Sequence, residues 1–282
     1  MQVSAKTLLP SLMTRCGADW NAASSDYGRH ISPKFTPVYA QDLISRLELT
    51  QEFSVIEVAA GTGALTLAMA KKVDSILATD LSPDMISLLQ LHLRERGISN
   101  VKTARMNGEQ LSCAERSFDR AACMFGIMLF TSPERGVQQL LRTLKPGGKS
   151  VISVWGNPQR FELMQMCADG VSKCCPELPR PDLHRNPAFT LCDSDRLAEM
   201  MRTVGFKKIL IDTVSRSTTF TSVEEFWSIL FSAAPPFRKI LAGVSNNRHT
   251  ALKELIRKDC LSRFGPFPLE LRTEALICLG ES

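Results

Sequence analysis

The sequence predicts an α/β fold in which a doubly wound, mostly parallel seven-stranded sheet carries a helical cap. Short apolar and β-branched runs alternate with helical patterns of about 10–14 residues, the element order that builds parallel sheets. A turn rich in small residues at 59–63 joins the first such run to a helix. Two segments, 156–192 and 216–268, are too long to be simple connections and are predicted to form the cap over the strand ends.

The strands are predicted where apolar runs end in turn or capping signals. In order along the chain they span 54–58, 75–80, 101–106, 120–124, 150–155, 208–214 and 271–279. Helices are expected between them and in the cap, at 64–72, 82–96, 132–144, 161–174, 193–204 and 249–263, the last basic and amphipathic. The segment 145–148, Lys-Pro-Gly-Gly, is expected to be a turn before the fifth strand.

Capping residues define several of these helices. Ser82 and Ser132 are each followed by proline and an acidic residue, which suits the first turn of a helix. Gly97 and Gly205 follow the predicted helix ends and suit the C′ position. The S-x-x-E sequence at 222–225 is typical of a capping box and opens a further helix in the cap.

The 282 residues are predicted to form one domain. A helical lead-in precedes a ligand-binding core, and two later segments complete the sheet around the cap insertions. These parts are, respectively, 1–50 for the lead-in, 51–155 for the core, 156–192 and 216–268 for the cap, and 193–215 and 269–282 for the end of the sheet.

The stretch at 55–66, VIEVAAGTGALT, carries the strongest functional signal. Gly61 and Gly63 allow the backbone to approach a ligand closely and to turn into a helix, whose N-terminal N–H groups face a polar ligand. Asp80 lies nineteen residues after Gly61, at the end of the second predicted strand. A carboxylate there suits a bidentate hydrogen bond to ribose hydroxyls. The sequence therefore predicts a nucleoside cofactor, although a simple tight turn would explain the glycines alone.

Two cofactor classes use this geometry. Nicotinamide and flavin enzymes require G-x-G-x-x-G, and here the third glycine position holds Thr66. An NAD(P)-dependent oxidoreductase is kept as an alternative, weakened by that residue.

Further motifs follow in a fixed order. The pattern acidic-x-small-x-Gly-x-Gly runs from Glu57 to Gly63, and it is followed by N-G-E-Q-L at 107–111, S-F-D at 117–119 and L-K-P-G-G at 144–148. Together with Asp80, this series resembles class I S-adenosylmethionine-dependent methyltransferases, in particular the ubiquinone-biosynthesis-like (methyltransferase type 11) group that acts on small molecules. Ala59 and Asn107 depart from the family, which usually has glycine and aspartate there.

The resemblance implies a Rossmann-like fold, S-adenosyl-L-methionine as cofactor and methyl transfer to a small-molecule acceptor by in-line displacement. It implies that Glu57 stays ionised near the turn or the cofactor's ammonium, and that Met106 and Asn107 contact the adenine. The implied cofactor contacts are Glu57, Ala59, Gly61, Gly63, Asp80, Leu81, Met106, Asn107, Gly108, Phe125 and Tyr27.

Several of these residues have simpler interpretations. Asn107 could form its own loop turn, and Phe125 could be a core residue rather than part of the transfer site. Trp20 and Tyr27 could staple the lead-in to the core. A non-catalytic binding module on the same fold is a third functional alternative.

No general base is assigned. His184, in the first cap insertion, is a weak candidate, and His92 is expected on the helix surface. No Ser/His/Asp triad or metal-ligand cluster is recognised, so no metal is expected.

The composition limits the partners and the cellular compartment that the sequence predicts. A net charge of +5 without a basic, aromatic-rich patch predicts no nucleic-acid partner. No apolar run reaches the ~18–20 residues of a membrane span, so no stable membrane insertion is expected. Nine cysteines without a C-x-x-C pair favour a reducing, cytoplasmic compartment. The basic first eighteen residues leave a mitochondrial presequence as a minor alternative. The oligomeric state is not predicted.

Overall fold

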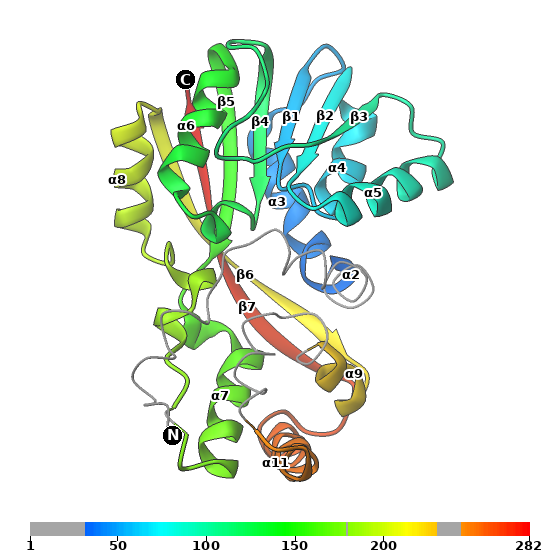
Figure 1. The fold of residues 1–282 in the computed structure, drawn as a ribbon, viewed down its shortest axis with the longest axis vertical. Helices are drawn as coiled ribbons and strands as arrows, with labels where there is room; N and C mark the ends of the chain where they lie inside the picture. The colour runs from blue at the N-terminus through cyan, green and yellow to red at the C-terminus, as the bar shows by residue number, and fades with distance from the viewer. Residues whose placement is uncertain (1–31, 179, 230–243) are drawn as a thin grey trace, which may run out of the picture.

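The structure is a computed structural model that describes residues 32–178, 180–229 and 244–282 (Figure 1). The first part of the lead-in, with Trp20, Tyr27 and His30, lies outside these ranges, as does the basic segment of the first eighteen residues.

One seven-stranded sheet organises the described residues, with the order β3-β2-β1-β4-β5-β7-β6. Strands β1 to β5 are parallel, and β7 runs antiparallel to both of its neighbours. This confirms the predicted doubly wound, mostly parallel sheet. The strands are β1 (Ser54–Val58), β2 (Ser75–Asp80), β3 (Val101–Arg105), β4 (Phe118–Met124), β5 (Leu144–Trp155), β6 (Lys207–Phe220) and β7 (Leu269–Glu281).

The helices follow their predicted positions closely. Next to the sheet lie α3 (Pro37–Leu47), α4 (Ala64–Met69) with the 3-10 turn Ala70–Lys72, α5 (Pro83–Glu95), α6 (Pro133–Thr143) and α8 (Ser194–Val204). Ser82 caps α5 by accepting a hydrogen bond from Met85 N at 3.2 Å. Gly205 follows α8 with φ +114°, a conformation that favours glycine.

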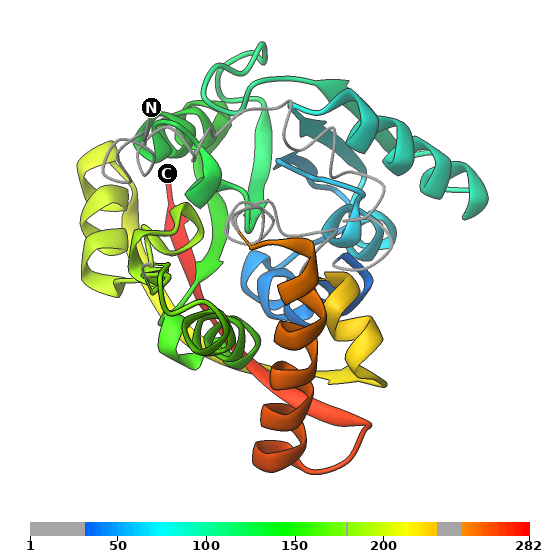
Figure 2. The same cartoon turned by 60° about the horizontal axis from the view of Figure 1, so that its bottom comes forward.

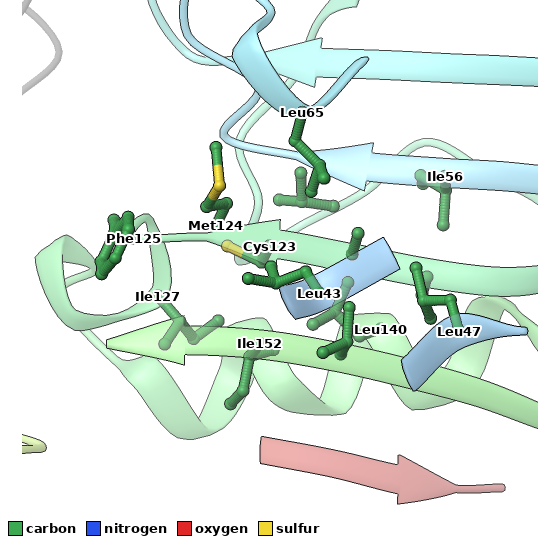
Figure 3. Packing of buried hydrophobic residues seen from close by; sticks show 14 of the residues in the cluster. Leu43, Leu47, Ile56, Leu65, Cys123, Met124, Phe125, Ile127, Leu140 and Ile152 are labelled. Atoms are coloured by element: carbon green, nitrogen blue, oxygen red, sulfur yellow. The ribbon is translucent and has the colours of Figure 1, made fainter. Parts of the chain in front are cut away.

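The main core fills the space between the sheet and its helices. Figure 3 shows Leu43 and Leu47 of α3 on one side of the central strands and Leu140 of α6 on the other. Ile56, Leu140 and Ile152 are fully buried between these layers. Apolar burial on both faces explains why the parallel strands read as nearly continuous apolar runs.

Two strand boundaries differ by six residues from the predicted ones, at the start of β5 and at the end of β6, and the others differ by at most two. The turn expected at 145–148 is included in β5, but its ladder passes from Leu144, opposite Phe118, directly to Lys149, opposite Arg120. The intervening residues therefore bulge out of register, with Gly147 at φ +75°.

The second correction concerns the end of β6. Residues 216–220 were predicted as the start of the cap insertion, but they continue β6 and pair with β7 as far as Leu269. Only Ala275–Glu281 of β7 also pair with β5. The rest of the hairpin therefore forms a two-stranded arm that extends below the sheet in Figure 1. Threonines and a terminal phenylalanine suit this strand extension.

The cap surrounds that arm with α7 (Glu162–Cys174), α9 (Val223–Ser228) and α11 (Asn246–Phe264). Figure 2 shows the orange α11 between the green α7 and the yellow α9. Phe220, Phe226 and Leu252 are fully buried in this second core. The short helix α2 (Ser32–Phe35) places Phe35 in the same cluster. Trp155, at the end of β5, packs against both cores and so joins the cap to the sheet.

Candidate cofactor site

The turn between β1 and α4 has the backbone that its glycines predict. Gly61 and Gly63 adopt φ +56° and +94°, in the left-handed region where glycine is favoured. A Cβ at Gly63 would overlap Leu89 of α5, whereas a Cβ at Gly61 would meet no atom within 4 Å. Gly63 is therefore required for packing, and Gly61 faces open space that a ligand could fill.

Asp80 lies at the end of β2, beside this turn. Its Oδ2 accepts the Gly61 N–H at 2.8 Å, and its Oδ1 accepts the Ser82 N–H at 2.9 Å. Burial raises the pKa of Asp80, and the hydrogen bonds from Ser82 and Gly61 oppose the rise. Since a carboxylate oxygen has two lone pairs, each oxygen retains one acceptor position for a ribose hydroxyl.

Glu57 was expected to stay ionised, but its surroundings favour the neutral acid. The side chain is 1% exposed, and Thr66 Oγ1 donates a hydrogen bond to its Oε2. Burial raises the pKa of Glu57 to about 8, against the Thr66 hydrogen bond and with a further contribution from the Asp80 charge. Burial and the neighbouring acid therefore favour the neutral form of this carboxyl group. In the sequence, Thr66 is notable only because it occupies the position of the third glycine in G-x-G-x-x-G. Its hydrogen bond to Glu57 was not predicted.

The turn at 59–63 meets the end of β4 at the point where the strand order reverses. A Cβ at Gly126 would overlap Ala59 Cβ, so only glycine allows the two loops to approach this closely. Ala59 and Phe125 both adopt φ +56°. Non-glycine residues in this region cluster at functional sites, because the strain must be held by the surrounding structure. Ala59 thus adopts the backbone of the glycine that it replaces.

The Phe125 ring lies in a buried aromatic group rather than in open space. It stacks on Trp155 with ring centroids 4.0 Å apart and meets Tyr39 edge-on at 5.3 Å. The Phe125 N–H is held by the carbonyl and the hydroxyl oxygen of Ser153 on β5, at 3.0 and 3.2 Å. The core-packing interpretation therefore describes the position of this ring.

The residues expected around the adenine follow β2 and β3. Leu81, next to Asp80, is a large apolar side chain left 41% exposed. Met106 is half-buried, and its backbone N–H donates to the Asp80 carbonyl at 3.0 Å. Gly108 is buried, and a Cβ there would lie 2.7 Å from Val58 Cγ1 and would overlap the Phe130 ring. Gly108 therefore permits close packing beside the turn.

Asn107 has the simpler arrangement that the sequence left open. Its side-chain Oδ1 accepts the Glu109 N–H at 2.9 Å, and its backbone carbonyl accepts the Gln110 N–H at 2.9 Å. This is a self-stabilised loop turn of the Asx type. If Asn107 Oδ1 also accepted a hydrogen bond from the adenine amino group, as expected, it would accept from the adenine and from the Glu109 N–H together.

Of the two histidines considered from the sequence, His92 contacts the glycine turn and His184 does not. His184, the weak catalytic candidate, is exposed on the cap. His92 was expected on the surface, but it is half-buried and its Nδ1 lies 2.9 Å from the Thr62 carbonyl oxygen. His92 thus supports the turn from α5, which the helical pattern alone did not reveal. Tyr27 lies outside the described residues.

Other kinds of site are not seen in the described parts of the chain. No group of three or more His, Cys, Asp or Glu side chains there could hold a metal ion. Among the described helices, none combines the length and apolar character of a membrane span. A surface pocket of about 560 Å³ between α8 and β6 is lined by none of the residues predicted to contact the cofactor.

Known proteins resemble this chain in sequence and in fold. Residues 55–148, from β1 into the bulge of β5, match a family described as a methyltransferase domain. A ubiquinone/menaquinone biosynthesis C-methyltransferase of Shewanella oneidensis is 30% identical over 168 residues, covering 55% of this chain and 66% of the relative. The match thus spans just under two thirds of that relative's length.

Solved structures share the fold. A putative methyltransferase from Bacillus halodurans superposes with a TM-score of 0.56 at 17% identity, over 86% of this chain and 97% of the other. A phosphoethanolamine N-methyltransferase of Haemonchus contortus, solved with S-adenosylhomocysteine, superposes with a TM-score of 0.53 at 16% identity, over 86% of this chain and 52% of the other. The matched domain, the sheet order and the turn tied to Asp80 agree with one another, and together they support a class I S-adenosylmethionine-dependent methyltransferase.

Proposed function

We propose that this protein transfers the methyl group of S-adenosyl-L-methionine to a small-molecule acceptor by in-line displacement. The observation that carries the proposal is the open space in front of Gly61, next to the carboxylate of Asp80. An anionic acceptor of hydroxyl hydrogen bonds beside an unobstructed glycine suits an adenosine whose ribose lies on Asp80. The reversal of strand order between β1 and β4 is also where open α/β sheets bind ligands.

In this arrangement the adenine would lie between Leu81 and Met106, near Asn107 and Gly108. Leu81 supports this placement because its exposed apolar surface adjoins the ribose-binding carboxylate. The methionine portion would extend over Gly61 toward Ala59 and the end of β4.

The cofactor supplies an electrophilic methyl group on a sulfonium, so the protein needs mainly to orient the acceptor. Holding two reactants in line can contribute several kcal/mol to lowering the barrier. We assign no general base, since His184 is exposed on the cap. An acceptor with an acidic carbon or a neutral amine needs none.

The two hydrophobic cores support a division of roles along the chain. Residues 51–155 would bind the cofactor, and the cap would close over the acceptor. A row of aromatic contacts connects the core to the cap. The ring centroids of Trp155 and Phe161 are 5.0 Å apart, and those of Phe161 and Phe189 are 6.1 Å apart. These buried rings hold the cap against the core. The relatives named for ubiquinone and menaquinone biosynthesis support a small-molecule acceptor.

We further infer a cytoplasmic enzyme without a nucleic-acid partner or stable membrane insertion. The cysteines that the structure describes are all free thiols, which suits a reducing compartment.

Thermal unfolding with four ligands tests the proposal. S-adenosylmethionine and S-adenosylhomocysteine should each raise the Tm, because a ligand at a hundred times its Kd adds about 2.7 kcal/mol of stability. NADH and FAD should leave the Tm unchanged. Stabilisation by NADH alone would instead support the oxidoreductase alternative, and stabilisation by none of the four would contradict the assignment of this site.

A further inference from the structure

Two acidic side chains flank the glycine turn but differ in how they are satisfied. Glu57 on β1 and Asp80 on β2 lie on neighbouring parallel strands. Both oxygens of Asp80 accept backbone N–H groups, which favour a charged carboxylate. Glu57 is more deeply buried and is held by the Thr66 hydroxyl. The two carboxyl groups are therefore set up to carry different charges at neutral pH.

Among the residues that the structure describes, the groups that face Glu57 supply no positive charge. Its electrostatic neighbours among the described residues are Asp80 on β2 and the Cys123 thiol on β4, and α4 contributes the Thr66 hydroxyl. From α5, His92 reaches the Thr62 carbonyl instead. A buried carboxylate without a cation is costly, so the neutral acid is favoured. Its pKa, raised to about 8, agrees with this arrangement.

We propose that Glu57 gives up its proton when S-adenosylmethionine binds over the turn, so that cofactor binding is coupled to proton release. This inference rests on the proposed function. The O–H bond of the Glu57 carboxyl breaks, its proton passes to the solvent, and the carboxylate that remains is stabilised by the positive charge of the ligand. The cofactor carries an ammonium and a sulfonium, and Glu57 is within electrostatic reach of Asp80, which binds the Gly61 N–H beside the open space.

The coupling has a definite sign. Below the raised pKa of about 8, the free protein holds the proton that the complex has lost. Binding near pH 7 should therefore release up to about one proton, and affinity should rise with pH by at most about tenfold per unit. Above pH 8 the free protein is already ionised, so both effects should fade. If Glu57 were ionised in both the free protein and the complex, it would contribute neither proton release nor a rise in affinity with pH.

Isothermal titration calorimetry measures the released proton directly. S-adenosylmethionine is titrated into the full-length protein near pH 7 in phosphate and in Tris, which differ in ionisation enthalpy. The difference in observed heat gives the number of protons released. Glu57→Gln should lose most of this release, whereas Glu95→Gln, which removes an exposed acid on α5, should retain it. Titration of the cofactor's own amine is common to all variants and cancels in the comparison.

A second variant covers the case in which Glu57→Gln fails to fold. Thr66→Val removes the hydroxyl that stabilises the charged form, so proton release should persist to a higher pH than in the unchanged protein. Equal proton release by the unchanged protein, Glu57→Gln and Thr66→Val would overturn the inference while leaving the cofactor assignment intact. Absence of saturable binding to the unchanged protein at any pH would instead contradict the proposed function itself.

Discussion

Asp80 Oδ2 accepts the Gly61 N–H at 2.8 Å, so the carboxylate at the end of β2 fixes the turn that follows β1. The same side chain accepts the Ser82 N–H at the start of α5. Asp80 thus joins two β-α connections. A residue expected from the sequence to bind ribose also holds together the cradle in which the ribose would lie.

Gly61 and Gly63 should respond differently to alanine. Gly63→Ala forces a side chain at φ +94° into Leu89, and we expect a loss of about 2–3 kcal/mol of stability. Gly61→Ala meets no atom and should cost about 1 kcal/mol for its left-handed backbone. However, its methyl group would occupy the space assigned to the cofactor. Urea unfolding and cofactor titration on both variants measure the contrast. Normal S-adenosylmethionine affinity in Gly61→Ala would show that the ligand does not lie against this residue.

Stability should fall with pH because of Glu57. Its folded pKa of about 8 lies above the ordinary glutamate pKa of 4.5, so the folded state holds more protons than the unfolded chain between these values. The favourable contribution is full below about pH 4.5 and is lost as pH rises to about 8, at up to about 1.4 kcal/mol per unit. Glu57→Gln should lack this slope. Urea denaturation near pH 6 and pH 8 makes the comparison, and an equal slope in both proteins would show that Glu57 is ionised when folded.

Trp155 should be important for the attachment of the cap. Its ring stacks on Phe125 at 4.0 Å and meets Phe161 at 5.0 Å, so Trp155→Ala should cost about 3 kcal/mol. Leu210→Ala provides a control, because Leu210 is 63% exposed and should change stability by less than about 0.5 kcal/mol. Chemical denaturation of both variants gives the two values. Similar small losses would mean that the aromatic contacts do not hold the two cores together.

The sequence predicted the elements whose signals are local. β1 agrees at both ends, and α5 and α8 begin at their predicted caps, because capping and periodicity depend on neighbouring residues. β6 was predicted too short, because its extension as an arm depends on pairing with a strand about fifty residues later. Nothing local distinguishes such a strand from a polar connection.

The candidate site shows the same division. The conformations of Gly61 and Gly63 follow from residue type, as does the position of Asp80 at a strand end. The protonation of Glu57 does not, because it depends on burial by α4 and β4 and on the neighbouring acid. The His92 contact to the turn and the Asn107 loop also depend on how separate segments pack. The amino-acid sequence alone does not give the distances between these segments.

Calorimetric affinity for S-adenosylmethionine in the unchanged protein and in Asp80→Ala tests the central claim most directly. The account predicts saturable binding by the unchanged protein and at least tenfold weaker binding by the folded variant, a difference of about 1.4 kcal/mol or more. Circular dichroism establishes that the variant remains folded. Unchanged affinity in folded Asp80→Ala would contradict the placement of the ribose on this carboxylate.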